Sequence, residues 1–303
     1  MTFDLLDLFA GPGGVGCGAR QVGLTEVGLE WGRHECATRS AAGLATVRTD
    51  VAAYPPERFA GIEGMWASPP CPDFSQAGRQ GGVDGESGWL TEAVPSWVEA
   101  AGPRWFACEQ VPPAIFLWRQ HADRYRQMGY KVWTGILSSE RFGVPQVRRR
   151  AILMAHRDRQ PQPPEPTHGR WRSDWDHAPT DLFSLPPITL ADAIDLGQHR
   201  DAWPWRRPAS TLTTDRRLSD PGRRKLNGGV ALCMYPAART FTTNQLRAGD
   251  FSPGVMSVKL TLRESLIVQG FPEDWPVNGP PSQIGNAVPP PLAAAILERL
   301  ACP

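Results

Sequence analysis

Short apolar runs recur along the first half of the chain, with segments of helical length between some of them. The runs cover residues 3–9, 26–29, 45–49, 62–67, 105–108, 131–137 and 151–154. Runs of this length that are bounded by polar residues and glycines are typical of buried β-strands. Residues 89–101, which include Pro95, and residues 115–128 have helical length, and residues 291–300 form an amphipathic helix. This alternation predicts an α/β fold whose mainly parallel sheet is covered on both faces.

A glycine-rich turn follows the first run directly, and a helix is expected to begin near Val15. Glycine allows a positive φ and a close approach of backbone to ligand, and a helix start offers free N–H groups. Glu30 lies about 20 residues further on, the spacing at which α/β proteins place a carboxylate for ribose hydroxyls. The pattern predicts a nucleoside site. Asp50 could accept a hydrogen bond from an exocyclic amine and Trp31 could stack on a purine, although a solvated aspartate and a core tryptophan are the ordinary alternatives.

Cys71 stands between prolines in the sequence Ser-Pro-Pro-Cys-Pro-Asp-Phe-Ser, just after the run 62–67. Each proline fixes its own φ and restricts the residue before it, so the thiol is held on a stiff backbone. A buried structural thiol is the ordinary alternative. Glu109 follows the run 105–108, and ends of parallel strands share one edge of a sheet. We therefore expect a covalent catalyst in which Cys71 attacks an electrophilic carbon while Glu109 handles a proton.

Charge and composition predict a second, smaller domain. The net charge is only +1, but the segment between residues 200 and 225 contains eight basic residues and only three acidic ones, all aspartates. Arginine suits phosphate and guanine recognition, although a GC-rich genome would also favour it. Threonine-rich alternating pieces in the same region predict short strands. We expect a small, mostly non-helical domain over 199–275, and a larger domain formed by 1–198 and 276–303.

The cysteines and the apolar runs exclude several classes of protein. The six cysteines, at 17, 36, 71, 108, 233 and 302, form no CxxC pair, so neither a metal site nor a disulfide framework is expected. No apolar run approaches the roughly 20 residues that span a bilayer. The chain does not begin like a signal peptide. We expect a cytoplasmic protein without metal or membrane partner.

In its motifs, the chain resembles the DNA (cytosine-5)-methyltransferase family. The matching stretches, in the order of the family, are residues 7–14 (DLFAGPGG), 69–75 (PPCPDFS), 109–111 (EQV), 146–150 (QVRRR), 263–272 (RESLIVQGFP) and 283–290 (QIGNAVPP). The resemblance implies a Rossmann-like S-adenosylmethionine-dependent methyltransferase fold with a smaller, mostly irregular or β target recognition domain. It extends over both ends of the chain. Two positions depart from the family pattern: Gln110 replaces the usual Asn, and Glu86 the common Arg.

The resemblance also implies roles for individual residues. Cys71 would add to carbon 6 of a flipped cytosine, and Glu109 would contact ring nitrogen 3 and the exocyclic amine. Arg150 would hold the carbonyl oxygen of the base, with Arg148 and Gln146 in support. The residues implied to line the S-adenosyl-L-methionine site are Phe9, Gly11, Gly13, Glu30, Trp31, Asp50, Asn286 and Val288.

The expected function is transfer of methyl to carbon 5 of a cytosine in a specific sequence of double-stranded DNA. The expected setting is a monomer in a bacterial cytoplasm, as a bacterial or phage protein, with a restriction endonuclease as a separate partner. Three alternatives stay open at this point: an RNA cytosine methyltransferase, a catalytically silent DNA-binding regulator on the same fold, and transfer of a modified group from a relative of the cofactor.

Overall fold

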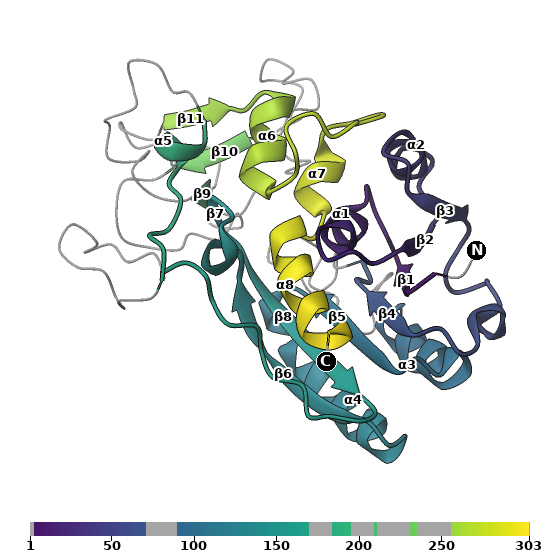
Figure 1. The fold of residues 1–303 in the computed structure, drawn as a ribbon. Coiled ribbons are helices and arrows are strands. Elements are labelled where there is room, and N and C mark those ends of the chain that lie inside the picture. The colour runs from purple at the N-terminus through teal and green to yellow at the C-terminus, as the bar shows by residue number, and fades with distance from the viewer. Residues whose placement is uncertain are drawn as a thin grey trace, which may run out of the picture.

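The fold is built around one seven-stranded sheet (Figure 1). This computed structural model describes residues 3–70, 90–169, 184–194, 209–210, 231–234 and 256–302. The strands of the sheet are β1 (Leu5–Leu8), β2 (Glu26–Glu30), β3 (Ala45–Arg48), β4 (Gly64–Ala67), β5 (Trp105–Gln110), β6 (Lys131–Ser138) and β8 (Arg149–His156). Their order is β3-β2-β1-β4-β5-β8-β6. The chain thus steps outwards from β1 to β3 and returns on the other side of β1 with β4.

Strand direction decides which residues meet at each edge of the sheet. The neighbours from β3 to β5 all pair in parallel, whereas β8 runs antiparallel to both β5 and β6. Arg150, near the start of β8, lies opposite Leu137, near the end of β6. At the other end of β8, His156 lies opposite Trp105, the first residue of β5. The start of β8 therefore shares one edge with the ends of the other strands, which we call the carboxyl edge.

Helices cover both faces of the sheet. The helices of the described chain are α1 (Gly14–Gln21), α2 (Arg33–Ala41), α3 (Leu90–Ala101), α4 (Ile115–Gln127), α5 (Leu190–Ala193), α6 (Leu262–Gln269), α7 (Ser282–Asn286) and α8 (Pro290–Ala301), of which α1, α3, α4 and α8 pack on the sheet. Alternate residues of the strands point to opposite faces. Leu6 and Phe106 accordingly pack with residues of α3 and α4, while Trp66 and Ala107 pack with residues of α1 and α8. Each face of the sheet has its own apolar core.

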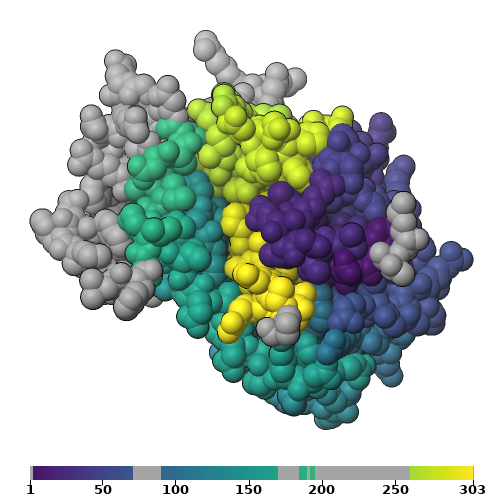
Figure 2. Space-filling view, in the orientation of Figure 1, coloured from purple at the N-terminus to yellow at the C-terminus, as the bar shows by residue number. Residues whose placement is uncertain are grey.

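The C-terminal segment returns to the N-terminal part of the molecule, as the yellow and purple surfaces of Figure 2 show. Leu266, Phe271 and Ile284 form one buried cluster with residues of α1 and the α2–β3 turn. The indole Nε1 of Trp275 donates to the carbonyl oxygen of Pro12 at 3.3 Å. Segments from both ends of the chain thus build the same side of the carboxyl edge.

Two small sheets stand beside the main one. β7 (Gln146–Val147) pairs in parallel with β9 (Ala209–Ser210), and β10 (Ala231–Met234) pairs antiparallel with β11 (Met256–Lys259). The remaining residues between 199 and 255 lie outside the described part of the chain. The expected boundaries of a recognition domain at 199 and 275 therefore stay a prediction.

The expected α/β fold with a mainly parallel sheet is confirmed, and each of the seven apolar runs overlaps a strand. Strand β5 extends further than expected, because Glu109 and Gln110 pair with Ile152 and Ala151 of β8. Helix α3 includes Pro95 within its span. The short helices α2, α6 and α7 were not predicted.

Candidate active site

The glycine turn after β1 opens the carboxyl edge. Phe9 has a φ of 61°, the one positive value of a non-glycine residue in the described part of the chain, and Gly11 and Gly13 have φ values of 54° and 97°. Gly13 is the N-cap of α1 and offers no side-chain cap. A Cβ added to Gly11 would meet no atom within 4 Å. The turn therefore presents backbone to an open space in front of a helix start, as a ligand-binding turn requires.

Glu30, the last residue of β2, holds this turn in place. One carboxylate oxygen accepts from the N–H of Gly11 at 2.8 Å, and the other accepts from the N–H of Gly32 at 2.7 Å. Burial raises the pKa of Glu30 above its ordinary value, while the backbone hydrogen bonds act in the opposite direction. Beside it, the Trp31 side chain is 72% exposed. An aromatic face free to stack thus lies next to a buried carboxylate.

Asp50 follows β3 and is exposed, with Oδ1 accepting from the N–H of Ala52 at 2.9 Å. Asn286, the last residue of α7, is also exposed, whereas Val288 is buried. The carbonyl oxygen of Val288 lies so close to Gly14 that a Cβ added there would be 2.1 Å away. The candidate cofactor residues of both chain ends thus approach one another around the start of α1.

A second group of side chains centres on β5 and β8. Nε of Arg150 lies 2.6 Å from Oε1 of Glu109, and each side chain is about 10% exposed. Nη1 of Arg150 donates to the carbonyl oxygen of Arg149 at 2.8 Å. The reversed direction of β8 explains the meeting, since it brings the start of β8 beside the end of β5. The result is a buried ion pair at the carboxyl edge.

Cys71 lies outside the described residues, but the backbone that leads to it is described. The N–H of Ser68 donates to the carbonyl oxygen of Leu8 at 3.2 Å, and the indole of Trp66 donates to the Ser68 hydroxyl at 2.6 Å. The buried amide of Gln110 donates to the carbonyl oxygen of Pro69 at 3.1 Å. The chain is thus anchored beside Glu109 until two residues before the thiol.

The remaining two candidates lie at the approach to β8. Arg148 is buried, and its carbonyl oxygen accepts from the N–H and the hydroxyl of Ser139 at 3.0 and 3.1 Å. The Gln146 amide donates to the carbonyl oxygen of Val268 at 3.1 Å and to Oε1 of Gln269 at 2.8 Å. These partners of Gln146 belong to α6, so its side chain joins β7 to the C-terminal segment.

A buried charge cluster under the glycine turn was not predicted. Nη2 of Arg39 donates to both oxygens of Glu26, at 2.7 and 2.9 Å. Asp7 is fully buried, and its carboxylate lies 4.0 Å from Nη1 of Arg39 and has no hydrogen-bond partner in the part of the chain that the structure describes. Burial raises the pKa of Asp7 well above its ordinary value of 3.8, and Glu26 raises it further. The sequence did not predict these contacts, because Arg39 lies on helix α2, which contains none of the recognised motifs.

Motif reasoning gave no role to Gln269 or to the cluster around Arg39. For Gln110 there was a signal, since it departs from the family pattern. Gln269 donates from its amide to the carbonyl oxygen of Ala287 at 2.6 Å. It therefore links the partners of Gln146 to the residues around Val288.

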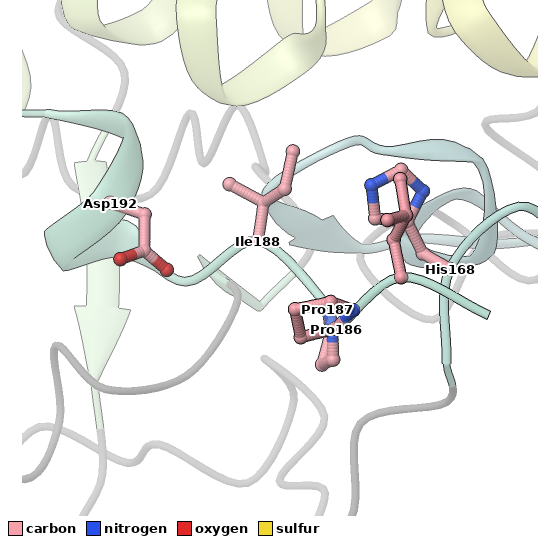
Figure 3. Close-up of a pocket in the computed structure, with 6 residues that line it drawn as sticks. His168, Pro186, Pro187, Ile188 and Asp192 are labelled. Atoms are coloured by element: carbon pink, nitrogen blue, oxygen red, sulfur yellow. The ribbon is translucent and has the colours of Figure 1, made fainter. Parts of the chain in front are cut away.

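A shallow pocket lies before α5, lined by His168, Leu185, Pro186, Pro187, Ile188 and Asp192 (Figure 3). Oδ2 of Asp192 accepts from the N–H and hydroxyl of Thr189 at 2.9 and 2.6 Å, and Nδ1 of His168 lies 2.9 Å from the Thr167 hydroxyl. Both polar side chains are thus accounted for by local structure.

Among the described residues, no group of His, Cys, Asp or Glu is suited to hold a metal ion, and no helix is long and apolar enough to cross a membrane.

The sequence profile described as "C-5 cytosine-specific DNA methylase" matches residues 3–188 and 214–302. The chain therefore belongs to the family of C-5 cytosine-specific DNA methylases. The match covers both groups of side chains at the carboxyl edge, including the stretch with Cys71. The resemblance carried by the ordered motifs is confirmed at the level of the family.

Curated relatives in the family are similar over nearly their whole length. The type II methyltransferase M.NgoMIV of Neisseria gonorrhoeae is 27% identical over 330 residues, covering 99% of this chain and 97% of the relative. M.NgoBI of the same organism is 28% identical over 308 residues, covering 97% and 91%. Among solved structures, a mutant of Spodoptera frugiperda DNMT2 has a TM-score of 0.65 at 14% identity, covering 99% of this chain and all of that one. At this identity the likeness shows the fold alone, and it agrees with a Rossmann-like methyltransferase.

Proposed function

We propose that the protein methylates carbon 5 of a cytosine within a specific sequence of double-stranded DNA, with S-adenosyl-L-methionine as methyl donor. The observation that carries this proposal is the Glu109–Arg150 pair, buried at the carboxyl edge beside the anchored approach to Cys71. A carboxylate and a guanidinium side by side match the hydrogen-bonding edge of a cytosine, which offers a ring nitrogen, an amine and a carbonyl oxygen. The family match supports the same reaction.

The residues around the glycine turn fit S-adenosylmethionine. Open space at Gly11 allows the cofactor to approach the backbone closely. The carboxylate of Glu30 suits a ribose, and the exposed face of Trp31 suits an adenine. Asp50 would accept from the adenine amine, and Phe9, Gly13, Asn286 and Val288 would complete the site. When bound, the cofactor supplies an electrophilic methyl group. The chain's own task at this end is to hold that methyl group towards the base.

At the other end, the proposed chemistry is covalent. The sulfur of Cys71 forms a bond to carbon 6 of the cytosine, and the electron pair of the 5,6 double bond makes carbon 5 nucleophilic. Glu109 stabilises this state by sharing a proton with ring nitrogen 3 and accepting a hydrogen bond from the exocyclic amine, while Arg150 holds the carbonyl oxygen. Arg148 and Gln146 support the start of β8. After carbon 5 has gained the methyl group, a base removes its proton and the thiolate leaves.

The reacting base must leave the duplex, because carbon 6 of a stacked cytosine is out of reach. Extrusion costs a few kcal/mol, which contacts to phosphate and to the base must offset. The roughly 90% burial of Glu109 and Arg150 supports this step, since a stacked base could not reach them. The basic region within 199–275 is proposed to neutralise phosphate and read base edges. The relatives are named type II methyltransferases, which favours a restriction-modification setting with a separate endonuclease.

Replacement of the proposed nucleophile tests the reaction. Cys71→Ala is expected to abolish transfer of labelled methyl to duplex DNA while cofactor binding, measured by calorimetry, is retained. Cys302→Ala, at an exposed thiol far along the chain, serves as the control and should transfer at the normal rate. Transfer that survives Cys71→Ala would refute the covalent mechanism. If the wild type labels tRNA and not DNA, the substrate is RNA. If the wild type labels neither, a catalytically silent DNA-binding protein is favoured.

A further inference from the structure

Gln110 uses both ends of its carboxamide in the interior of the protein. It is the last residue of β5 and is 1% exposed. Nε2 donates to the carbonyl oxygen of Pro69 at 3.1 Å, and Oε1 accepts from the N–H of Val111 at 2.7 Å. One side chain therefore ties the end of β5 to the segment that leaves β4.

Two consecutive prolines precede Cys71 in the segment after β4. Ser68 supplies the last backbone N–H before the thiol, and it donates to the carbonyl oxygen of Leu8 at 3.2 Å. Pro69 and Pro70 have no N–H, so their carbonyl oxygens are the only backbone groups through which they can be bonded. The amide of Gln110 binds the first of these two carbonyls. It therefore fixes the chain two residues before Cys71, at a point where the backbone itself cannot donate.

Gln110 directly follows Glu109 in the sequence. Glu109 is held by Arg150 at 2.6 Å, so its place at the carboxyl edge is fixed independently. Gln110 thus joins the residue after the proposed base-contacting carboxylate to the backbone that leads towards the proposed nucleophile. A misplacement of about 1 Å can cost about 100-fold in rate, so a link at this point bears on the chemical step.

We infer that Gln110 is a positioning residue that sets the approach of the Cys71 sulfur to the base. The inference rests on the proposed function. It also explains the departure from the family pattern, in which Asn stands at this position. An Asn side chain is shorter by one methylene, roughly 1.5 Å of reach, so in this chain it would leave the Pro69 carbonyl beyond hydrogen-bond distance.

The variant Gln110→Glu gives a readout that a purely structural role would not produce. A protonated Glu can donate to the Pro69 oxygen, whereas an ionised Glu can only accept, as from Val111. Single-turnover methyl transfer by Gln110→Glu, relative to the wild type at each pH, is expected to be close to normal at low pH. It should fall by about 10- to 100-fold as the pH rises. Gln110→Met, which can never donate, should be slow at every pH.

The sulfur addition can be followed directly with duplex DNA that carries 5-fluorocytosine at the target base. Sulfur bonds to carbon 6 and methyl to carbon 5, but fluorine replaces the proton that must leave, so the adduct persists. Gln110→Met should form this adduct about 10- to 100-fold more slowly than the wild type, with unchanged affinity for S-adenosylmethionine. Gln120→Glu, the same substitution on an exposed face of α4, should behave as the wild type at all pH values.

The outcomes separate the two proposals. If the wild type forms no adduct and transfers no methyl group, the proposed function fails. If the wild type is active but Gln110→Glu keeps the wild-type pH profile, or Gln110→Met traps DNA at the normal rate, only the positioning role is overturned. Should Gln110→Glu not fold, as judged by urea unfolding, Gln110→Asn takes its place. It is expected to slow adduct formation at normal cofactor affinity, and an unchanged rate would contradict the inference.

Discussion

Helix α1 begins in direct contact with the backbone of residue 288, and substitution of Gly14 tests what that contact does. An alanine Cβ at this position would stand 2.1 Å from the carbonyl oxygen of Val288. The two must separate by about 0.9 Å to reach 3.0 Å, the closest approach that such atoms show. Because the oxygen belongs to the backbone, it cannot swing away as a side chain would. The start of α1 and the segment between α7 and α8 must therefore move apart.

Two opposing terms set the magnitude for Gly14→Ala. Alanine in place of glycine within a helix gains about 1 kcal/mol. Overpacking a tight contact costs about 1–3 kcal/mol, and a rigid backbone contact favours the upper part of this range. We expect a net loss of about 1–2 kcal/mol in the free energy of unfolding. The movement also displaces the glycine turn, so S-adenosylmethionine should bind at least about tenfold more weakly, which corresponds to about 1.4 kcal/mol.

Urea unfolding and calorimetric titration with the cofactor measure the two effects. Gly18→Ala is the matched control, because its Cβ would lie 2.7 Å from the carbonyl oxygen of Pro290, one turn further along α1. It should cost stability but leave cofactor affinity within about twofold, since the crowded residues are away from the turn. A Gly14→Ala protein that is more stable than the wild type and binds the cofactor normally would refute the reasoning.

Two further predictions concern buried polar groups. Because the pKa of Asp7 is raised in the folded state, the folded protein keeps a proton that the unfolded chain releases, and this carboxyl lowers the free energy of unfolding as the pH rises above about 4. The free energy of unfolding of Asp7→Asn, relative to the wild type, should therefore increase between about pH 5 and pH 8 in urea titrations; a difference that is flat or declines contradicts the prediction. Gln269→Leu removes an acceptor for Gln146 and a donor to Ala287, and should lower the free energy of unfolding by about 1–3 kcal/mol. Wild-type stability of this variant would show that the linked amides add nothing.

The parts of the site that follow from local sequence could be predicted well. A glycine turn after an apolar run and a carboxylate about 20 residues later specify a strand, a turn and a second strand end. Glu30 accordingly accepts from the N–H of Gly11. The motif that contains Arg150 was equally visible. What local sequence did not contain was that β8 runs antiparallel beside β5, which is what brings Arg150 to Glu109.

Contacts that depend on tertiary packing were missed for the same reason. The pairing of Arg39 with Glu26 requires that a helix lie over β2, and no spacing rule states this. Gln110 was noticed as a departure from the family, yet its partner Pro69 is 41 residues away and belongs to a neighbouring strand exit. The role of a residue that bonds across strands becomes visible only when the register of those strands is known.

The reversed direction of β8 also divides the chain into a part that must keep its length and a part that need not. Only two residues separate Gln146 from β8, and the second residue of β8, Arg150, pairs with Glu109. The length of the chain between Gln146 and Arg150 is therefore fixed by these contacts. The far end of β8 leaves the sheet at His156, opposite Trp105, at the edge away from the reaction. Among the described residues, no strand after His156 joins this sheet. A change in chain length after that point is therefore expected to disturb the Arg150–Glu109 pair less than a change between Gln146 and Arg150.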